Sequence, residues 1–290
     1  MIDIDWLAEQ FEANRAHLRG VAYRMLGSLP DSEDAVQEAW LRLSRSDTSA
    51  IDNLAGWLTT VVGRVCLDIL RMRKSRREEA LEPERAEQLQ AGGAARDPEQ
   101  ELLLANSVGL ALLVILDALD PAERLAFVLH DMFAMPFDDI AAILERTPEA
   151  ARQLASRARR RVQGSRKAVP PDLAQQRSVV DAYLAAARGG DFDALMSVLA
   201  PDIVLRADHK ALPAGPSEMR DPAVIAQRAI KAGARAAQPA LVNGKVGLVI
   251  APRGKLLMVL TFTIVANRIK EMEAIAEPDR LNQLELAVLP

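Results

Sequence analysis

Arginine side chains crowd one short stretch of the chain at a spacing that suits binding to a polyanion. The polar residues of that stretch are Arg152, Gln153, Ser156, Arg157, Arg159 and Arg160. The first four fall on or near one helix face, where guanidinium and amide groups can pair with guanine and adenine edges. We expect Arg159 and Arg160 to contact phosphates, which position a helix without reading sequence. A basic helix end without base contact is the alternative.

A second group of residues has the types needed for proton transfer. Asp202, Asp208 and His209 lie close in sequence, and a carboxylate beside a histidine in a pocket can act as acid or base. The chain has only three histidines, no metal-ligand cluster accompanies them, and Lys210 follows directly. This composition favours a ligand-sensing or structural pocket, so we assign no catalytic residue, no metal and no cofactor.

The arginine-rich stretch must be held by a helix, a turn and a second helix. Apolar residues recur at helical spacing from Phe137 to Leu144, and the pattern breaks at residues 145–147. Thr147, Pro148 and Glu149 then restart a helix with a hydroxyl N-cap, a proline at the first position and an acid in the first turn. Residues 136–166 are therefore predicted to form a helix-turn-helix.

Length and charge limit the possible classes of protein. The chain has 290 residues, which predicts two or three domains, and a formal net charge of -4. Residues 53–77 are nevertheless strongly basic, which suits local contact with nucleic acid. Cys66 is the only cysteine, so no disulfide forms within the chain. Because residues 1–5 do not resemble a signal peptide and no apolar run is long enough to span a membrane, we place the protein in the cytoplasm.

Three helices are predicted before residue 78. Residues 6–26 show an amphipathic pattern, a second helix opens at Asp31, and a long helix over residues 55–77 turns basic towards its end. The second helix has a crowded polar face made of Asp31, Glu33, Asp34, Gln37 and Glu38. That face is either a solvated surface with acids near the helix N-terminus or a docking face for a basic partner.

Residues 31–43, 57–62 and 68–71 resemble region two of extracytoplasmic-function (ECF) sigma factors of the sigma-70 family, and residues 121–161 resemble region four. The resemblance implies that the acidic helix docks on the clamp helices of the largest subunit of core RNA polymerase. It also implies that the loop at Asn53 and the basic helix open and read the minus-ten element. The residues expected there are Asn53, Arg64, Arg71, Arg73 and Lys74. The arginine-rich helix is then expected in the major groove of the minus-thirty-five element.

The chain changes character after residues 170–171. Helices are expected over residues 173–188, 192–199 and 221–237, and strands over 203–207, 240–251 and 255–275, which indicates an α+β domain. Residues 183–202 resemble the start of a SnoaL-like, cone-shaped domain. Near the end, Pro278, Asp279, Arg280 and Leu281 resemble a motif of the ECF group with this extension. The resemblance implies a regulatory role for these residues, and a plain turn is the alternative.

These patterns predict a multidomain chain with two all-α helical domains followed by an α+β SnoaL-like domain. The expected boundaries are region two at 1–77, a linker at 78–105, region four at 106–168 and a regulatory domain at 172–290. We expect a sigma factor that binds core RNA polymerase and promoter DNA, with a possible small-molecule ligand of the last domain and no enzymatic activity. The alternative is a small-molecule-binding or enzymatic SnoaL-like domain fused to a DNA-binding transcription regulator.

Overall fold

A computed structural model describes residues 4–46, 51, 53–79, 109–164, 172–213, 215–232, 234, 236–252 and 255–289. Most of the expected linker lies outside the described residues. The chain divides into two compact units, the first made of Met1–Val108 and Leu116–Arg159 and the second of Gly109–Ile115 and Arg160–Pro290. No helix in the described part of the chain is long and apolar enough to cross a membrane.

The first unit begins with three helices, α1 (Ile4–Leu26), α2 (Leu29–Leu43) and α3 (Leu54–Glu79). Gly27 has a φ of 68°, a left-handed conformation that ends α1 at little cost because glycine has no Cβ. Ser28 then caps α2, accepting a hydrogen bond from the Asp31 amide at 3.5 Å, so α2 starts two residues earlier than the sequence suggested. The fully buried residues at the centre of this bundle are Leu18, Val21, Ala22, Met25, Ala39, Leu43, Leu58, Val62 and Cys66.

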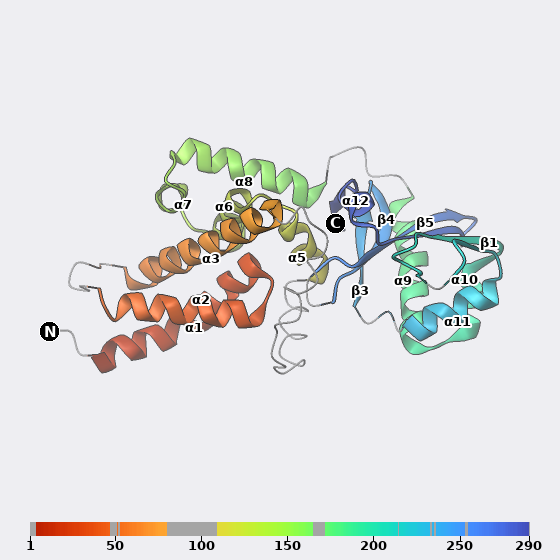
Figure 1. Cartoon of the computed structure of the whole chain (residues 1–290), viewed down its shortest axis with the longest axis horizontal. Coiled ribbons are helices and arrows are strands. Elements are labelled where there is room, and N and C mark those ends of the chain that lie inside the picture. The colour runs from red at the N-terminus through yellow and green to blue at the C-terminus, as the bar shows by residue number, and fades with distance from the viewer. Residues whose placement is uncertain are drawn as a thin grey trace. The chain divides into compact units, whose positions relative to one another are not determined.

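The helix-turn-helix is formed as predicted. The preceding elements are α5 (Leu110–Asp117), α6 (Pro121–Phe127) and the short π-helix η4 (Val128–Met132), and the motif itself is α7 (Phe137–Leu144) and α8 (Pro148–Gln163). Glu145 has a φ of 55° and ends α7, and the Thr147 hydroxyl accepts from the Ala150 amide at 3.2 Å. The helices α6 and α7 lie against α3 (Figure 1).

The second unit contains a mixed sheet with helices packed on it. The helices are α9 (Leu173–Gly189), α10 (Phe192–Val198), α11 (Pro222–Ala232) and the short α12 (Pro278–Leu281). The strands are β1 (Leu199–Ala207), β2 (Glu218–Met219), β3 (Ala237–Val242), β4 (Lys245–Ile250), β5 (Met258–Val265), β6 (Arg268–Ile275) and β7 (Leu286–Ala287). Their order is β2-β1-β6-β5-β4-β3-β7, with β1 and β6 parallel and the other pairs antiparallel.

Successive residues of β4 enter two different apolar clusters, as alternation along a strand requires. Val246 and Leu248 belong to the larger cluster, which includes residues of α9, α10 and α11 (Figure 1). Val249 belongs to a smaller cluster, against which Leu281 of α12 packs. The predicted architecture is therefore confirmed: helical domains are followed by an α+β sheet domain.

Two of the strands expected from the sequence are wrong in detail, because each expected range contains residues of two strands joined by a tight turn. Residues 240–251 contain the end of β3 and all of β4, joined at Asn243 and Gly244, whose φ values are 51° and 80°. Residues 255–275 contain β5 and β6, joined at Ala266 and Asn267, with φ values of 48° and 62°. Two successive residues with positive φ form the tight turn that matches the twist of paired strands. The Asn-Gly pair was the available signal.

Candidate nucleic-acid interface

Helix α8 presents a polar face built around four exposed side chains. Its apolar side is buried through Ala151, Leu154, Ala155, Ala158 and Val162. At 100° per residue, the opposite direction is occupied by Gln153, Ser156 and Arg160, and Arg152 lies to one side of them; all four are exposed. The guanidinium of Arg152 lies 5.6 Å from the centre of the Phe137 ring and 3.4 Å from the Glu149 carboxylate. Two of the four residues expected to read bases, Gln153 and Ser156, therefore lie at the centre of the exposed face.

Arg157 and Arg159 lie on opposite sides of this face and pair with acids of the scaffold. Nε of Arg157 is 3.1 Å from Oε1 of Glu123 on α6, whose side chain is only 9% exposed. On the other edge, both Nε, at 2.8 Å, and Nη2 of Arg159 donate to Oδ1 of Asp131 on η4. These contacts give both arginines a role in holding α8 against α6 and η4.

The residues expected at the minus-ten element lie along α3 and at its N-terminal cap. Most of them have hydrogen-bond or ion-pair partners. Asn53 is exposed and caps the helix, since its Oδ1 accepts from the Gly56 amide at 3.0 Å. Arg64 donates to the Ala142 carbonyl of α7 at 3.2 Å, and Lys74 lies 2.9 Å from the Asp120 carboxylate.

The other two cations of this set differ in exposure. Arg73 is half-buried, where it pairs with Asp31 at 2.7 Å and donates to the Leu26 carbonyl at 3.4 Å. Arg71 is exposed on α3. The structure thus brings all the minus-ten candidates onto one helix and its cap, but Arg73 also ties the end of that helix to α2.

The polar residues expected to form the docking face of α2 fall into two groups: some pair with residues of other helices, and the others face outward. Asp31 pairs with Arg73, and Glu33 lies 2.6 Å from Nε of Arg19. Asp34 and Gln37 are exposed, and Glu38 pairs with Arg42 at 3.0 Å along the helix.

Leu41 continues the outward face of α2, one turn beyond Gln37. It is one of the large apolar side chains that stay exposed, at 38%. This exposed apolar residue was not singled out from the sequence.

The proton-transfer candidates of the second unit do not form one site. Asp202 is 68% exposed and pairs with Lys270 at 3.3 Å, whereas Asp208 follows the opposite end of β1 with a side chain only 6% exposed. His209 is exposed. Among the described residues, no group of three or more histidine, cysteine, aspartate and glutamate side chains could hold a metal ion.

Asp208 instead organises the segment that carries the expected regulatory motif. Its Oδ2 accepts from the amides of Ala276 and Glu277, at 2.8 and 2.9 Å, and its Oδ1 accepts from the Ala211 amide at 2.8 Å. Burial acts to raise the pKa of Asp208, but these hydrogen bonds and the charge of Arg280 outweigh it and lower the pKa. The carboxylate therefore fastens the start of α12 to the end of β1.

Arg280 is the motif residue that joins this arrangement directly. Its Nη2 donates to Oε1 of Glu273 on β6, at 2.5 Å, and its Nη1 lies 3.8 Å from Asp208. This hydrogen bond to the Glu273 carboxylate raises the pKa of Arg280. Pro278 and Asp279 are exposed, and Leu281 packs against the smaller cluster of the sheet.

Several residues that shape the interface had no signal in the sequence. Glu123, Asp131 and Asp120 each hold a cation of the arginine-rich or basic helix. Glu123 is 34 positions from Arg157, and no spacing rule connects residues so far apart. Their roles become visible only when the helices are packed together.

Comparison with known families assigns each half of the helical part of the chain to a family model. The family model "Sigma-70 region 2" matches residues 10–77, and "Sigma-70, region 4" matches residues 109–162. Region 2 followed by region 4 defines the class of sigma-70-type initiation factors. Over 281 residues the chain is 34% identical to the probable ECF RNA polymerase sigma factor SigI of Mycobacterium tuberculosis, covering 97% of this chain and 96% of that protein.

A second relative from the same organism matches over a similar length. The ECF RNA polymerase sigma factor SigJ is 38% identical over 288 residues, covering 93% of this chain and 92% of SigJ. The crystal structure of SigJ covers 94% of this chain and 98% of its own, with 32% identity and a TM-score of 0.46. The chain belongs to the ECF RNA polymerase sigma factors. Sigma factors bind core RNA polymerase and promoter DNA and are not enzymes, so the alternative of an ordinary transcription regulator with an enzymatic domain falls away.

Proposed function

We propose specific roles for the three surfaces of this sigma factor. The outward face of α2 docks on the clamp helices of the largest polymerase subunit, the Asn53 cap and α3 engage the minus-ten element, and α8 reads the minus-thirty-five element. We also infer that the protein acts in the cytoplasm, where bacterial RNA polymerase is found. The observation that carries the proposal is the exposed face of α8, on which Arg152, Gln153 and Arg160 extend away from a buried apolar side.

The roles within α8 differ with the contacts that each side chain makes. Arg152 and Gln153 are placed to contact base edges, since arginine and glutamine form the favoured bidentate pairs with guanine and adenine. The contacts of Arg157 and Arg159 with Glu123 and Asp131 support a positioning role, in which these arginines hold the helix and add positive charge near phosphates.

The domain boundaries 1–77, 106–168 and 172–290 form part of the same proposal, together with a regulatory role for the last domain. Its larger cluster includes Tyr183, Leu195, Phe262 and Met272, all buried. The small-molecule ligand considered from the sequence is not part of this proposal. A regulatory contact through the α12 segment suits the structure better, because Asp208 and Arg280 hold that segment in a defined conformation.

Charge reversal on α2 tests the polymerase contact. The double variant Asp34→Lys and Glu38→Lys should lose most binding to core RNA polymerase in a pull-down, because it places cations where we expect a basic partner surface. Glu9→Lys is the control, since Glu9 is exposed on α1 outside the proposed face. Equal binding by the wild type and the double variant would remove α2 from the interface, and no binding by the wild type would contradict the proposed function.

A further inference from the structure

Two arginines lie on the same side of α8, two turns apart. Arg152 and Arg159 are separated by seven positions, which brings them to within about 20° of the same direction around the helix axis. Each contacts a side chain of the segment that precedes α8. Arg159 pairs with Asp131 of η4, whereas Arg152 lies over the ring of Phe137 at the start of α7. The two arginines are therefore held by different kinds of contact.

The short π-helix η4 supports both contacts. Asp131 accepts from Arg159, and the residue before it, His130, stacks on Phe137 with 3.9 Å between ring centres and 13° between ring planes. Contacts between aromatic rings add to the free energy gained by burying them, so the half-buried Phe137 ring has a preferred position. π-helices are rare and occur frequently at functional sites. Here one such helix fixes the surroundings of two arginines of α8.

The Phe137 ring can hold Arg152 without using its hydrogen-bond donors. The guanidinium carbon lies 5.6 Å from the ring centre, within the range of a cation–π interaction. A guanidinium stacked on a ring keeps its five N–H donors free, since they point outwards in its own plane. Those donors are the groups that pair with O6 and N7 of guanine. The ring contact is therefore compatible with base reading.

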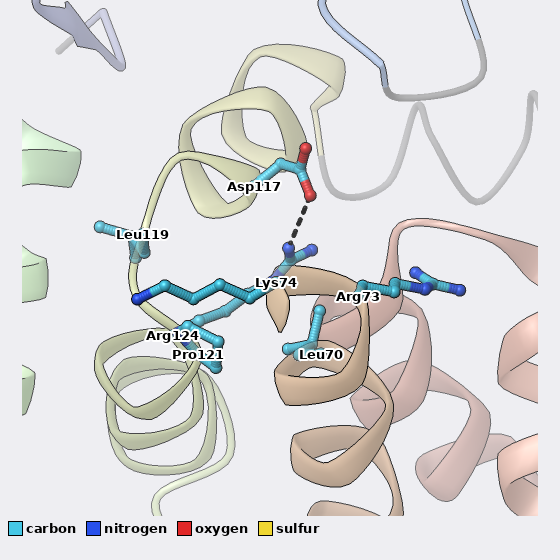
Figure 2. Close-up of a pocket in the computed structure, with 7 residues that line it drawn as sticks. All are labelled: Leu70, Arg73, Lys74, Asp117, Leu119, Pro121 and Arg124. Carbon is cyan, nitrogen blue, oxygen red and sulfur yellow. Dashed lines mark hydrogen bonds and ion pairs between the residues drawn. The ribbon is translucent and has the colours of Figure 1, made fainter. Parts of the chain in front are cut away.

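Arg124 of α6 is held in the opposite way, through its donors. It is only 2% exposed, its Nε donates to the Arg24 carbonyl at 3.1 Å, and its Nη1 lies 3.2 Å from the Asp117 carboxylate. Figure 2 shows this ion pair beside a small cavity of about 90 Å³. Because burying a guanidinium costs free energy unless its donors are paired, these donors serve the fold. The exposed guanidinium of Arg152 has no such burial cost to offset.

Arg152 has a second contact, an ion pair with Glu149 one turn earlier in α8. Its Nη1 lies 3.4 Å from Oε1 of Glu149, and the two side chains are 54% and 71% exposed. Exposed pairs of this kind contribute little free energy and are screened by salt. A carboxylate here also repels DNA phosphates, and it occupies a donor that a base edge would need. The ring contact has neither drawback, so it is the contact that can persist when Arg152 binds DNA.

We propose that Phe137 is a positioning residue for promoter recognition. Its ring, fixed by His130, holds the Arg152 guanidinium in a base-reading orientation before DNA binds. A side chain that is already oriented loses less conformational entropy on binding. The inference rests on the base-reading role proposed above for Arg152. It adds two residues outside α8 to those that determine promoter specificity.

A double-mutant cycle tests the proposal through sequence preference. The full chain, assembled with core RNA polymerase, selects sites from random duplex DNA. Arg152→Ala should abolish the preference at one position, which identifies the base that Arg152 reads. Phe137→Leu should weaken the preference at that same position about two- to fivefold, the effect of losing an exposed cation–π contact. In the Arg152→Ala background, Phe137→Leu should have no further effect on it.

Two further variants separate the ring from general packing. Phe137→Tyr keeps the aromatic ring and should keep the preference. Phe133→Leu makes the same chemical change at a ring that contacts His17 and Arg24 of α1, so it is the control and should leave the preference unchanged. A uniform loss of affinity in Phe137→Leu, with every preference intact, would reduce the ring to a packing role and overturn the inference.

Glu149→Gln separates the ring contact from the ion pair, and its result does not depend on the folding of any Phe137 variant. Removal of an exposed acid should raise affinity for all DNA sequences and keep the preference at the Arg152 position. Loss of that preference would assign the positioning to Glu149 and overturn the inference, while the proposed base-reading role of Arg152 would stand. A uniform loss in Arg152→Ala itself would contradict that role, and the inference would fail with it.

Discussion

At the scale of single residues, we propose that α8 separates residues that read bases from residues that position the helix. Arg157 pairs with the buried Glu123 carboxylate, so Arg157→Ala should lower the free energy of unfolding. The arginine side chain is 51% exposed and partly screened by water, which limits the loss to about 1 kcal/mol. DNA affinity should fall by a similar factor for all promoter sequences. Urea unfolding and binding to a promoter library measure both effects.

Gln153→Ala is the matched substitution on the same helix. Gln153 is exposed, so the free energy of unfolding should stay within about 0.5 kcal/mol of wild type. If Gln153 reads a base, discrimination at one promoter position should fall by about 1 to 3 kcal/mol. A uniform loss for Gln153→Ala, or a position-specific loss for Arg157→Ala, would reverse the two roles.

The Asp208 carboxylate holds two backbone segments in place by accepting hydrogen bonds from their amides. In Asp208→Asn the amide NH2 can replace only one carboxylate oxygen and cannot accept from backbone amides, so hydrogen bonds at Ala276 and Glu277 or at Ala211 are lost. Because the carboxylate is buried, we expect the free energy of unfolding to fall by about 2 kcal/mol at pH 7.

The pH dependence of this effect has a defined sign. The pKa of Asp208 is lowered in the folded protein, so its stabilising contribution is complete above the ordinary aspartate pKa of about 3.9 and is lost as pH falls through the lowered value. The difference between wild type and Asp208→Asn should therefore shrink below about pH 4. Urea unfolding at several pH values measures it, and a constant difference down to pH 3 would contradict the assignment.

At the scale of elements, helices with a regular apolar stripe were predictable and the strands were less so. The pattern placed α1, α3, α7 and α8 to within a few residues, because each buries one continuous side. The strands β3 and β4 are rich in apolar residues facing two clusters, so no alternation marked the turn between them. Only the Asn243-Gly244 pair marked the position of that turn.

The candidate site was predictable in its composition but not in its contacts. Sequence placed Arg152, Gln153 and Ser156 on one face because helical spacing is a local property. The partners of Arg157 and Lys74 depend on how separate helices pack, which no local spacing encodes. The same holds for Asp208, whose partners lie 68 and 69 positions away.

The turn between β3 and β4 allows a test of backbone conformation alone. Gly244 has a φ of 80°, while Gly189 lies in α9, and a Cβ added at either would meet no atom within 4 Å. Gly244→Ala should therefore cost about 1 to 2 kcal/mol through its left-handed backbone. Gly189→Ala should be neutral or stabilising by up to about 1 kcal/mol, because alanine favours helices. Thermal unfolding compares them, and equal effects would show that φ does not control this turn.

At the scale of the whole molecule, the positions of the charged residues matter more for DNA binding than the net charge of the chain does. The 36 lysine and arginine residues are outnumbered by 40 aspartate and glutamate residues. Acids such as Glu123, Asp131 and Asp120 neutralise cations at the edges of the basic helices. The exposed arginines of α8 are concentrated on the side opposite its buried residues, which is how an acidic protein can bind DNA.

Removing the last domain tests whether it regulates the sigma factor. A chain truncated after Lys167 should still bind core RNA polymerase, because α2 and its proposed docking face are retained, and its transcriptional output in vitro should differ from that of the full chain.

Arg280→Ala in the full chain removes only the bonds from α12 to Glu273 and Asp208. If α12 carries the regulation, this substitution should shift output in the same direction as truncation, by part of its size. Lys270→Ala, which breaks the exposed pair with Asp202, is the control and should leave output unchanged. A truncated chain with wild-type output would remove the regulatory role, and a changed output without any effect of Arg280→Ala would place regulation elsewhere in the domain.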